Sequence, residues 1–318
     1  MINGELLLLG VAMAVINIGS LNIDYVYKVP HFLRAGETLR AENRAVHPGG
    51  KGLNQSIGVA RAGMTVFHTG AVGYDGDLLV NTLKRDGVDL THLDVHDKDP
   101  SGHTVIQVTP DGENCILYFP GTNEAVTVER VMATLDRAQP DDLVMLQNEL
   151  PNTTLMIEAA CARGLRTILN PSPFDDRLAD APFEKLYALI VNETEASQLL
   201  DVEQGELDKD ELMDALIARL PNVRLILTLG SHGSCGYDPD TGAFRVRPMR
   251  VKAVDTTGAG DTFAGFVVAS LARGEALEAA MRRATVAAAI SVTREGAATS
   301  IPTLDEVLVA EAQYDAGE

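Results

Sequence analysis

Short apolar segments alternate with amphipathic segments along most of this 318-residue chain. The apolar segments predict strands at Val15–Ile18, Val66–Ala71, Leu143–Leu146, Thr167–Leu169, Leu186–Val191, Leu225–Leu229 and Val251–Val254. The amphipathic segments predict helices at Leu53–Ala62, Asp77–Asp86, Val128–Ala138, Thr153–Arg163, Thr194–Leu200, Glu211–Leu220, Asp261–Ala272, Leu277–Thr293 and Leu304–Ala312. This alternation indicates an α/β fold with a doubly wound, mostly parallel sheet flanked by helices.

Two segments interrupt this alternation. Residues 22–46 carry partly polar strand patterns, and residues 104–119 predict a hairpin that turns at Pro110-Asp111-Gly112. Such inserts indicate a small second sheet or lid, in which Val29, Phe32 and Leu33 would be exposed unless a second subunit covered them. We find no internal repeat or long linker, so we expect one domain over residues 1–318.

Charge and cysteine content exclude several classes of protein. Lys and Arg number 26 against 45 Asp and Glu, a formal net charge of −19, so the surface would repel a nucleic-acid backbone. The three cysteines form no CxxC pair, which favours a reducing compartment over a disulfide framework or a zinc site. His92 and His96 have the spacing of a metal pair but lack further ligands nearby.

The N-terminal apolar run does not predict a membrane span. It comprises Leu6–Leu9 and Val11–Ile18, is broken by Gly10 and Asn17, and is too short to cross a bilayer. The residues before it include Glu5 and no Lys or Arg, so the basic region of a signal peptide is missing. We therefore expect a cytoplasmic protein with a short extension before its first strand.

The strongest chemical motif is the turn Asp255–Phe263, which leads into a helix. Backbone N–H groups of Gly258, Ala259 and Gly260 at a helix N-terminus would form an anion cradle suited to a transferring phosphoryl group. Asp261 would place a carboxylate beside that cradle. The alternative interpretation is that Asp261 only caps the helix.

The usual nucleotide-binding motifs do not fit. A dinucleotide fingerprint needs a third glycine where this chain has Phe263. A Walker A loop ending at Gly50-Lys51 would need glycine at Ala45 and Ser or Thr at Gly52. A dehydrogenase is therefore disfavoured, and any phosphate chemistry must use another cradle.

Further glycine-rich or polar turns follow other predicted strands. In His47–Gln55, the amides of Gly49 and Gly50 and the side chains of Lys51 and Asn54 could bind a polyol, or the segment is a plain helix-entry turn with a solvated lysine. Asn22 and Asp24 lie on one side of an extended segment, as sugar ligands or as an Asx turn. Weaker signals are Glu149, Thr228–Gly233, and Asn192 with Glu195, the last pair also a possible capping box.

On these motifs, the chain resembles the ribokinase (PfkB-type) family of carbohydrate kinases from Gly19 to about Pro302. The two glycine-rich stretches correspond to the family's two signatures in order and separation. Asn22, Asp24, the GGKG-L-N run and Glu149 in an LQNE setting most resemble the members that phosphorylate ribose. Thr285, where His or Asn is common near adenine, and Asn148, where an apolar residue is common, depart from the pattern.

The resemblance implies a role for each motif. Asp261 would be the base, with Gly258, Ala259 and Gly260 as the anion hole. Sugar contacts would come from Asn22, Asp24, Gly49, Gly50, Lys51, Asn54, Glu149 and Asp261. Nucleotide contacts would come from Asn192, Thr228, Leu229, Gly230, Ser231, His232, Gly233 and Gly260, with Glu195 acting on magnesium and phosphate. An activating monovalent cation, K⁺, would lie at Asp255, Thr257, Ser291, Arg294, Gly296 and Ser300.

The resemblance therefore implies an ATP- and Mg²⁺-dependent sugar kinase, with D-ribose as the expected acceptor and D-ribose 5-phosphate as the product. The lid would also form a homodimer interface. A nucleoside, fructose or a deoxy-ketosugar acid remains an alternative acceptor, although no arginine beside Asn22 or Gly50 favours an acid. A sugar-binding regulator without catalysis is the alternative from another class, and the intact Asp261 and Gly258–Gly260 argue against it.

Overall fold

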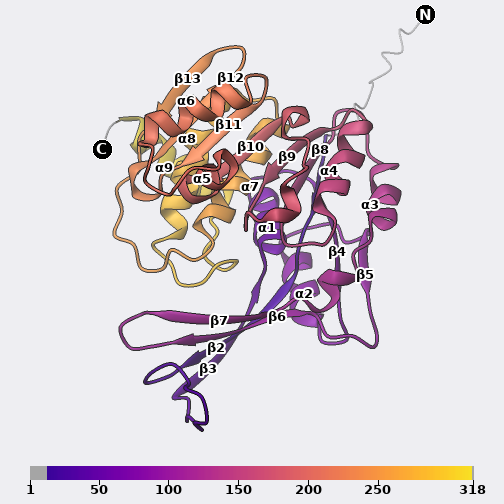
Figure 1. Ribbon diagram of the computed structural model, residues 1–318, viewed down its shortest axis with the longest axis vertical. Coiled ribbons are helices and arrows are strands. Elements are labelled where there is room, and N and C mark those ends of the chain that lie inside the picture. Colours follow the sequence, from indigo (N-terminus) through magenta and orange to yellow (C-terminus); the bar gives the residue numbers. More distant parts are fainter. Residues whose placement is uncertain (1–12, 317–318) are drawn as a thin grey trace, which may run out of the picture.

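The computed structural model describes residues 13–316 (Figure 1). The extension predicted before the first strand, including Leu6–Leu9, lies outside the described residues. Among residues 13–316, no helix combines the length and the hydropathy needed to cross a bilayer.

The larger of two sheets has nine strands in the order β13-β12-β11-β10-β9-β8-β1-β4-β5. Seven neighbouring strands, from β11 to β5, pair in parallel, and the β12–β13 hairpin adds an antiparallel edge. The strands are β1 Val15–Ile18, β4 Val66–Val72, β5 Leu93–Val95, β8 Leu143–Gln147, β9 Arg166–Asn170, β10 Ala188–Asn192, β11 Arg224–Thr228, β12 Ser234–Asp238 and β13 Gly242–Val246.

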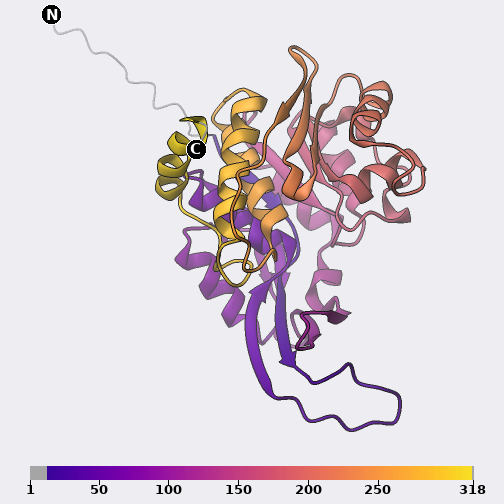
Figure 2. The same cartoon turned by 90° about the vertical axis from the view of Figure 1, so that its left-hand side faces the viewer.

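Helices cover both faces of this sheet, as Figures 1 and 2 show. Successive strand residues alternate between two cores: Val15 and Met145 belong to one, and Ile16 and Val144 to the other. The first core also takes residues of α1 Lys51–Arg61, α2 Asp77–Arg85, α7 Ala259–Ala272, α8 Leu277–Ser291 and α9 Leu304–Ala316. The second takes residues of α3 Val128–Leu135, α4 Thr153–Ala162, α5 Glu193–Leu200 and α6 Lys209–Arg219. The predicted fold class is confirmed.

One predicted strand is wrong. Residues 251–254 form no strand, and the side chains of Val251 and Val254 are 39% and 61% exposed. The sheet edge is already taken by β13, whose sequence gives only a weak strand pattern, and the chain then crosses a loop to α7. A short segment with two valines but no neighbouring strand to pair with does not become a strand.

The smaller sheet has four strands in the order β3-β2-β6-β7 and projects from the body (Figures 1 and 2). Its strands are β2 Asn22–Lys28, β3 Asn43–Gly49, β6 Gly102–Val108 and β7 Asn114–Phe119, so both inserts fold as the sequence predicts. Leu33 is 53% exposed and Phe32 is half-buried. Val29, however, is buried, because it continues the pairing of β2 by donating its N–H to the Val108 carbonyl at 2.9 Å.

A buried histidine makes stability depend on pH. His68 on β4 is fully buried, and burial lowers its pKa from 6.5 to about 4. The folded protein therefore holds His68 neutral, whereas the unfolded chain takes up a proton below about pH 6.5. Folding stability contributed by the neutral ring is present above that pH and is lost as the pH falls toward 4, by up to about 3 kcal/mol.

We expect urea unfolding to show this loss between pH 7 and about 4.5 in the wild type. The His68→Gln variant should show a shallower dependence over the same interval, because glutamine does not titrate. Equal slopes for the two proteins would contradict the assignment to His68.

Candidate active site

Two glycine-rich turns meet at the carboxyl ends of the central strands because the helices that follow them pack together. A Cβ atom on Gly265 of α7 would lie only 2.8 Å from the Gly58 Cα of α1. Glycine at this crossing permits the close approach of the two backbones. The first turns of both helices, which begin at Lys51 and Ala259, therefore open onto one site.

Asp261 lies at the centre of this site. Its side chain is buried, and Oδ2 accepts a hydrogen bond from Asn54 Nδ2 at 2.9 Å while Oδ1 accepts one from Gln55 Nε2 at 2.9 Å. Gly258 is the N-cap residue of α7, and no side chain caps the helix. The interpretation of Asp261 as a helix cap is therefore wrong: its carboxylate is held across the helix interface by α1.

The backbone beside Asp261 fits an anion. Gly258 has a φ of 74°, a left-handed conformation that favours glycine, and its carbonyl accepts the Thr262 N–H at 2.9 Å. Among the described residues, the Gly260 and Asp261 N–H groups have no hydrogen-bond partner, whereas the Ala259 N–H donates to the Thr256 carbonyl at 3.3 Å. A Cβ atom added at Gly260 would meet nothing within 4 Å, so open space lies beside these donors. Unpaired first-turn N–H groups and the helix dipole favour a negative charge there.

Lys51 and Glu149, both partly buried, meet at the start of α1. The Lys51 backbone N–H donates to Glu149 Oε2 at 3.1 Å, and the Ser20 hydroxyl donates to the same oxygen. Burial raises the pKa of Glu149, against the lowering effect of Lys51. Burial alone would lower the pKa of Lys51, but the carboxylates of Asp261, Glu149 and Glu195 outweigh it and raise this pKa. The Lys51 side chain is therefore positively charged and is stabilised by the charges of these three carboxylates.

Asn22 and Asp24 lie on the same side of β2, next to the turn that precedes α1. Asn22 pairs with Gly49 in the sheet register, and the Asp24 carboxylate occupies the space where a Cβ atom of Gly49 would be. Thr104 Oγ1 donates to Asp24 Oδ1 at 2.6 Å. Burial raises the pKa of Asp24, although Thr104 opposes the shift. Glycine at position 49 thus makes room for the acid.

An orphaned polar atom points to a polar ligand at this place. Asn54 Oδ1 is buried and has no hydrogen-bond partner among the described residues, while the Asn54 amide group donates to Asp261. A buried acceptor without a donor is costly, and a ligand hydroxyl would satisfy it. The predicted sugar contacts Asn22, Asp24, Gly49, Gly50, Lys51, Asn54 and Glu149 are accordingly brought to one region of the structure, with Asp261 at its inner end.

The predicted nucleotide contacts follow β10 and β11. Asn192 and Glu195 form a reciprocal capping box on α5, with bonds of 2.8 and 3.0 Å. The Thr228–Gly233 turn contains the short helix Gly230–His232, with Ser231 in its middle, and Leu229 is buried, so Leu229 can offer only its backbone. Asn192, Thr228 and Gly230 line a cavity of about 400 Å³ between β10, β11 and α5.

The predicted cation loop is partly assembled. Asp255 Oδ1 accepts the N–H and hydroxyl of Thr257, and Oδ2 accepts the Gly296 N–H at 2.9 Å, which joins two distant turns. Ser291 and Ser300 are buried, and their hydroxyls donate to the carbonyls of Ala288 and Ala297. The Arg294 side chain pairs instead with Glu306 at 2.6 Å, so only its backbone is available to a cation.

Several residues near the site were not singled out by sequence reasoning. Ser20 contacts Glu149, and Gln55 and Gln147 lie behind Asp261. Asn123, which is fully buried, donates to Asn22 Oδ1 at 2.8 Å and binds both backbone groups of Leu21. Ser20, Gln55 and Gln147 each lie within two residues of a recognised position, whereas Asn123 is 101 residues from the Asn22 side chain that it contacts and has no recognised motif beside it.

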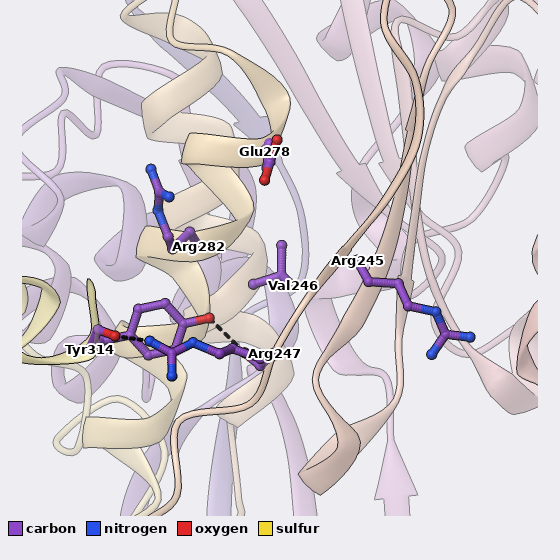
Figure 3. A pocket seen from close by; sticks show the side chains of 6 residues that line it. All are labelled: Arg245, Val246, Arg247, Glu278, Arg282 and Tyr314. Carbon is purple, nitrogen blue, oxygen red and sulfur yellow. Dashed lines mark hydrogen bonds between the residues drawn. The ribbon is translucent and has the colours of Figure 1, made fainter. Parts of the chain in front are cut away.

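A second cavity lies away from this site, between β13, α8 and α9 (Figure 3). It measures about 350 Å³ and is lined by Arg245, Val246, Arg247, Glu278, Arg282 and Tyr314. Arg245 points away from the other lining side chains and pairs with Asp210, and Arg247 packs on the Tyr314 ring. None of the predicted site residues contributes to it.

Comparison with known proteins gives one consistent result. The model of the pfkB family carbohydrate kinases matches residues 14–304. The chain is 33% identical over 297 residues to a ribokinase of Haemophilus influenzae, an alignment that covers 92% of this chain and 96% of the relative. A ribokinase from Cryptococcus neoformans var. grubii serotype A in complex with ADP has a TM-score of 0.81 and 33% identity, covering 94% of this chain and 99% of that one.

The ribokinase of Arabidopsis thaliana complexed with ribose and ATP has a TM-score of 0.82 and 26% identity, with coverage of 94% and 99%. The residues matched by the family model include both glycine-rich turns and the four strands of the small sheet. The chain therefore belongs to the pfkB family of carbohydrate kinases.

Proposed function

We propose that this protein transfers the γ-phosphoryl group of ATP to the 5-hydroxyl of D-ribose, giving D-ribose 5-phosphate. The observation that carries the proposal is the Asp261 carboxylate, held between α1 and α7 beside unpaired helix-terminal N–H groups. The similarity to ribokinases supports ribose and ATP as the substrates. Phosphoryl transfer depends mainly on positioning and charge stabilisation, which this arrangement supplies.

In this proposal the sugar hydroxyl oxygen forms a bond to the γ-phosphorus of ATP, and Asp261 accepts the proton of that hydroxyl. The bond from that phosphorus to the bridging oxygen breaks, and ADP leaves. The N–H groups of Gly258, Ala259 and Gly260 stabilise negative charge on the transferring group. The other sugar hydroxyls are bound by the orphaned Asn54 Oδ1 together with Asn22, Asp24, Gly49, Gly50, Lys51 and Glu149.

Asn192 and Thr228–Gly233, with Gly260, would contact the nucleotide. Mg²⁺ would be held by Glu195 together with the phosphates of ATP, where it neutralises phosphate charge. Among the described residues, no group of three His, Cys, Asp or Glu side chains is placed to hold a metal ion by itself. Mg²⁺ in phosphoryl-transfer sites is commonly bound through one or two carboxylates plus phosphates, and the Glu195 carboxylate fits such a donor set. The four-stranded sheet would act as a lid of a single domain and exclude water.

The test is a substrate panel. Purified protein with ATP and Mg²⁺ is offered D-ribose, 2-deoxyribose, fructose, a deoxy-ketosugar acid and inosine, and ADP release is measured. We expect the highest kcat/KM with D-ribose and negligible ADP release without sugar. A preference for a nucleoside or an acid would reassign the acceptor, and no turnover with any sugar would overturn the kinase proposal.

We also propose that K⁺ activates the enzyme at Asp255, Thr257, Ser291, Arg294, Gly296 and Ser300, several through backbone carbonyls. Carboxylate, hydroxyl and carbonyl oxygens are the donors that hard cations prefer. Asp255 connects the turn before α7 to Gly296, so its loss would loosen the cradle and the cation loop together.

We expect Asp255→Ala to reduce the increase in kcat caused by potassium chloride by roughly tenfold, the scale of one charge-assisted hydrogen bond. Tetramethylammonium chloride at equal ionic strength is the control, and an unchanged potassium response would contradict the site.

A homodimer through the lid is the third part of the proposal. β7 is an edge strand whose Ile116, Leu117, Tyr118 and Phe119 are 45–70% exposed. Contiguous exposed apolar residues on a sheet edge mark an interaction surface.

We expect Leu117→Glu to weaken dimerisation at least roughly 100-fold, because it would bury an unpaired carboxylate. Sedimentation velocity measures the effect, with Val309→Glu, at a 69% exposed position on α9, as the matched control. A wild-type monomer, or an unchanged dimer in Leu117→Glu, would contradict this interface.

A further inference from the structure

A buried chain of side-chain amides runs behind Asp261. Gln55, which is fully buried on α1, donates from Nε2 to Asp261 Oδ1 at 2.9 Å and to Asn170 Oδ1 at 3.0 Å. Its own Oε1 accepts from Gln147 Nε2 on β8 at 2.6 Å. Gln55 therefore joins the carboxylate to the two central strands β8 and β9.

The Asn17 end of this series of side-chain amides fixes the orientation of every amide group in the series. Asn17 Nδ2 donates to the Gly52 carbonyl and to Ser56 Oγ, both at 2.8 Å. A carbonyl only accepts, so the Asn17 amide group must face Gly52 and Asn17 Oδ1 must face Gln147. Gln147 Nε2 donates to that oxygen at 2.9 Å and to Gln55 Oε1. The NH₂ group of Gln55 is thereby directed toward Asp261.

The other end imposes the same orientation independently. Asn170 Nδ2 donates to the Ile190 carbonyl at 3.0 Å, which again can only accept. Asn170 Oδ1 then faces Gln55 and requires a donor from it. Because both ends terminate on backbone carbonyls, a flipped Gln55 would place its oxygen against Asn170 Oδ1 and the Asp261 carboxylate. The direction in which the amides donate along this series is therefore determined by backbone carbonyls of the sheet and of α1.

We infer that Gln55, oriented by Gln147, is a positioning residue that fixes the rotation of the Asp261 carboxylate for proton transfer. This inference rests on the proposed role of Asp261 as the base. Asn54 holds Oδ2 alone, and one hydrogen bond leaves the carboxylate free to turn about its Cβ–Cγ bond. The second donor, on Oδ1, stops that rotation. Each carboxylate oxygen retains a further lone pair, so a sugar hydroxyl can still be bound.

The test compares variants that remove or invert the donor. Gln55→Met keeps the length of the side chain and removes the donor, and Gln147→Glu replaces the donor toward Gln55 with an acceptor. We expect each to lower kcat by roughly 10- to 100-fold, the cost of a misplaced catalytic group, with KM for ribose and for ATP changed less than about threefold. In an Asp261→Ala background, Gln55→Met should cause no further decrease in kcat, because Gln55 acts only through Asp261.

Controls separate positioning from general damage to the core. Ser56→Ala removes a bond at the far end of the chain and should leave kcat within about twofold, because the Gly52 carbonyl still orients Asn17. Thermal unfolding is measured for every variant, and Gln55→Glu, a one-atom change, replaces Gln55→Met where the latter does not fold. Wild-type kcat in a folded Gln55 variant, or an equal further loss in the Asp261→Ala background, would overturn the inference. An active Asp261→Ala enzyme would instead refute the proposed base.

Discussion

Replacement of Asp261 by alanine is expected to lower kcat by roughly 10²- to 10⁴-fold, the range that general-base assistance usually contributes. The carboxylate is the acid group that both glycine-rich turns bring to the centre of the site. KM for ribose should change less than kcat, because proton transfer belongs to the transition state. Steady-state kinetics with ribose and ATP measure both constants.

The same substitution has a structural cost that needs a separate measurement. Removing the carboxylate leaves the buried amide group of Asn54 without an acceptor and takes one of two acceptors from that of Gln55, which destabilises the fold by about 1–3 kcal/mol. Activity is therefore compared well below the unfolding midpoint. Asp77→Ala is the matched control, because Asp77 lies in the first turn of α2 but is exposed. Turnover of Asp261→Ala near that of the wild type would remove the proposed role.

Replacement of Asp24 by alanine is expected to raise KM for ribose by roughly 10- to 100-fold and to leave KM for ATP nearly unchanged. A hydrogen bond to a charged group contributes about 1.5–3 kcal/mol, and each 1.4 kcal/mol corresponds to a factor of ten. Asp24 lies in the lid sheet next to Gly49, whereas the predicted nucleotide contacts follow β10 and β11. Initial-rate kinetics with each substrate varied in turn separate the two KM values.

Thr104→Val provides the comparison for this prediction. Thr104 donates to Asp24 Oδ1, so valine keeps the shape of the side chain and removes only that support. A smaller increase in KM for ribose is expected, because Asp24 remains in place next to Gly49. Equal increases in the KM values for ribose and ATP in Asp24→Ala would show a general disturbance of the lid and contradict a specific sugar contact.

Much of the fold follows from local patterns. Parallel strands buried on both faces are short and continuously apolar, so β1, β8 and β11 were predictable within a residue or two. Glycine-rich turns before α1 and α7 were equally visible, because each lies within one stretch of sequence. The edge hairpin β12–β13 was missed and residues 251–254 were wrongly assigned, since an edge strand depends on its neighbour more than on its own composition.

The site also depends partly on local sequence and partly on tertiary structure. The sequence alone indicated the family resemblance, the α/β architecture with its small second sheet, and a candidate carboxylate beside a cradle of amides. Only the tertiary structure decided that Asp261 is held by Asn54 and Gln55, residues more than 200 positions away, and is not a helix cap. The physical reason is that hydrogen bonds between distant segments depend on how helices cross. Here the crossing of α1 and α7 at Gly58 and Gly265 sets that geometry, and no local pattern encodes it.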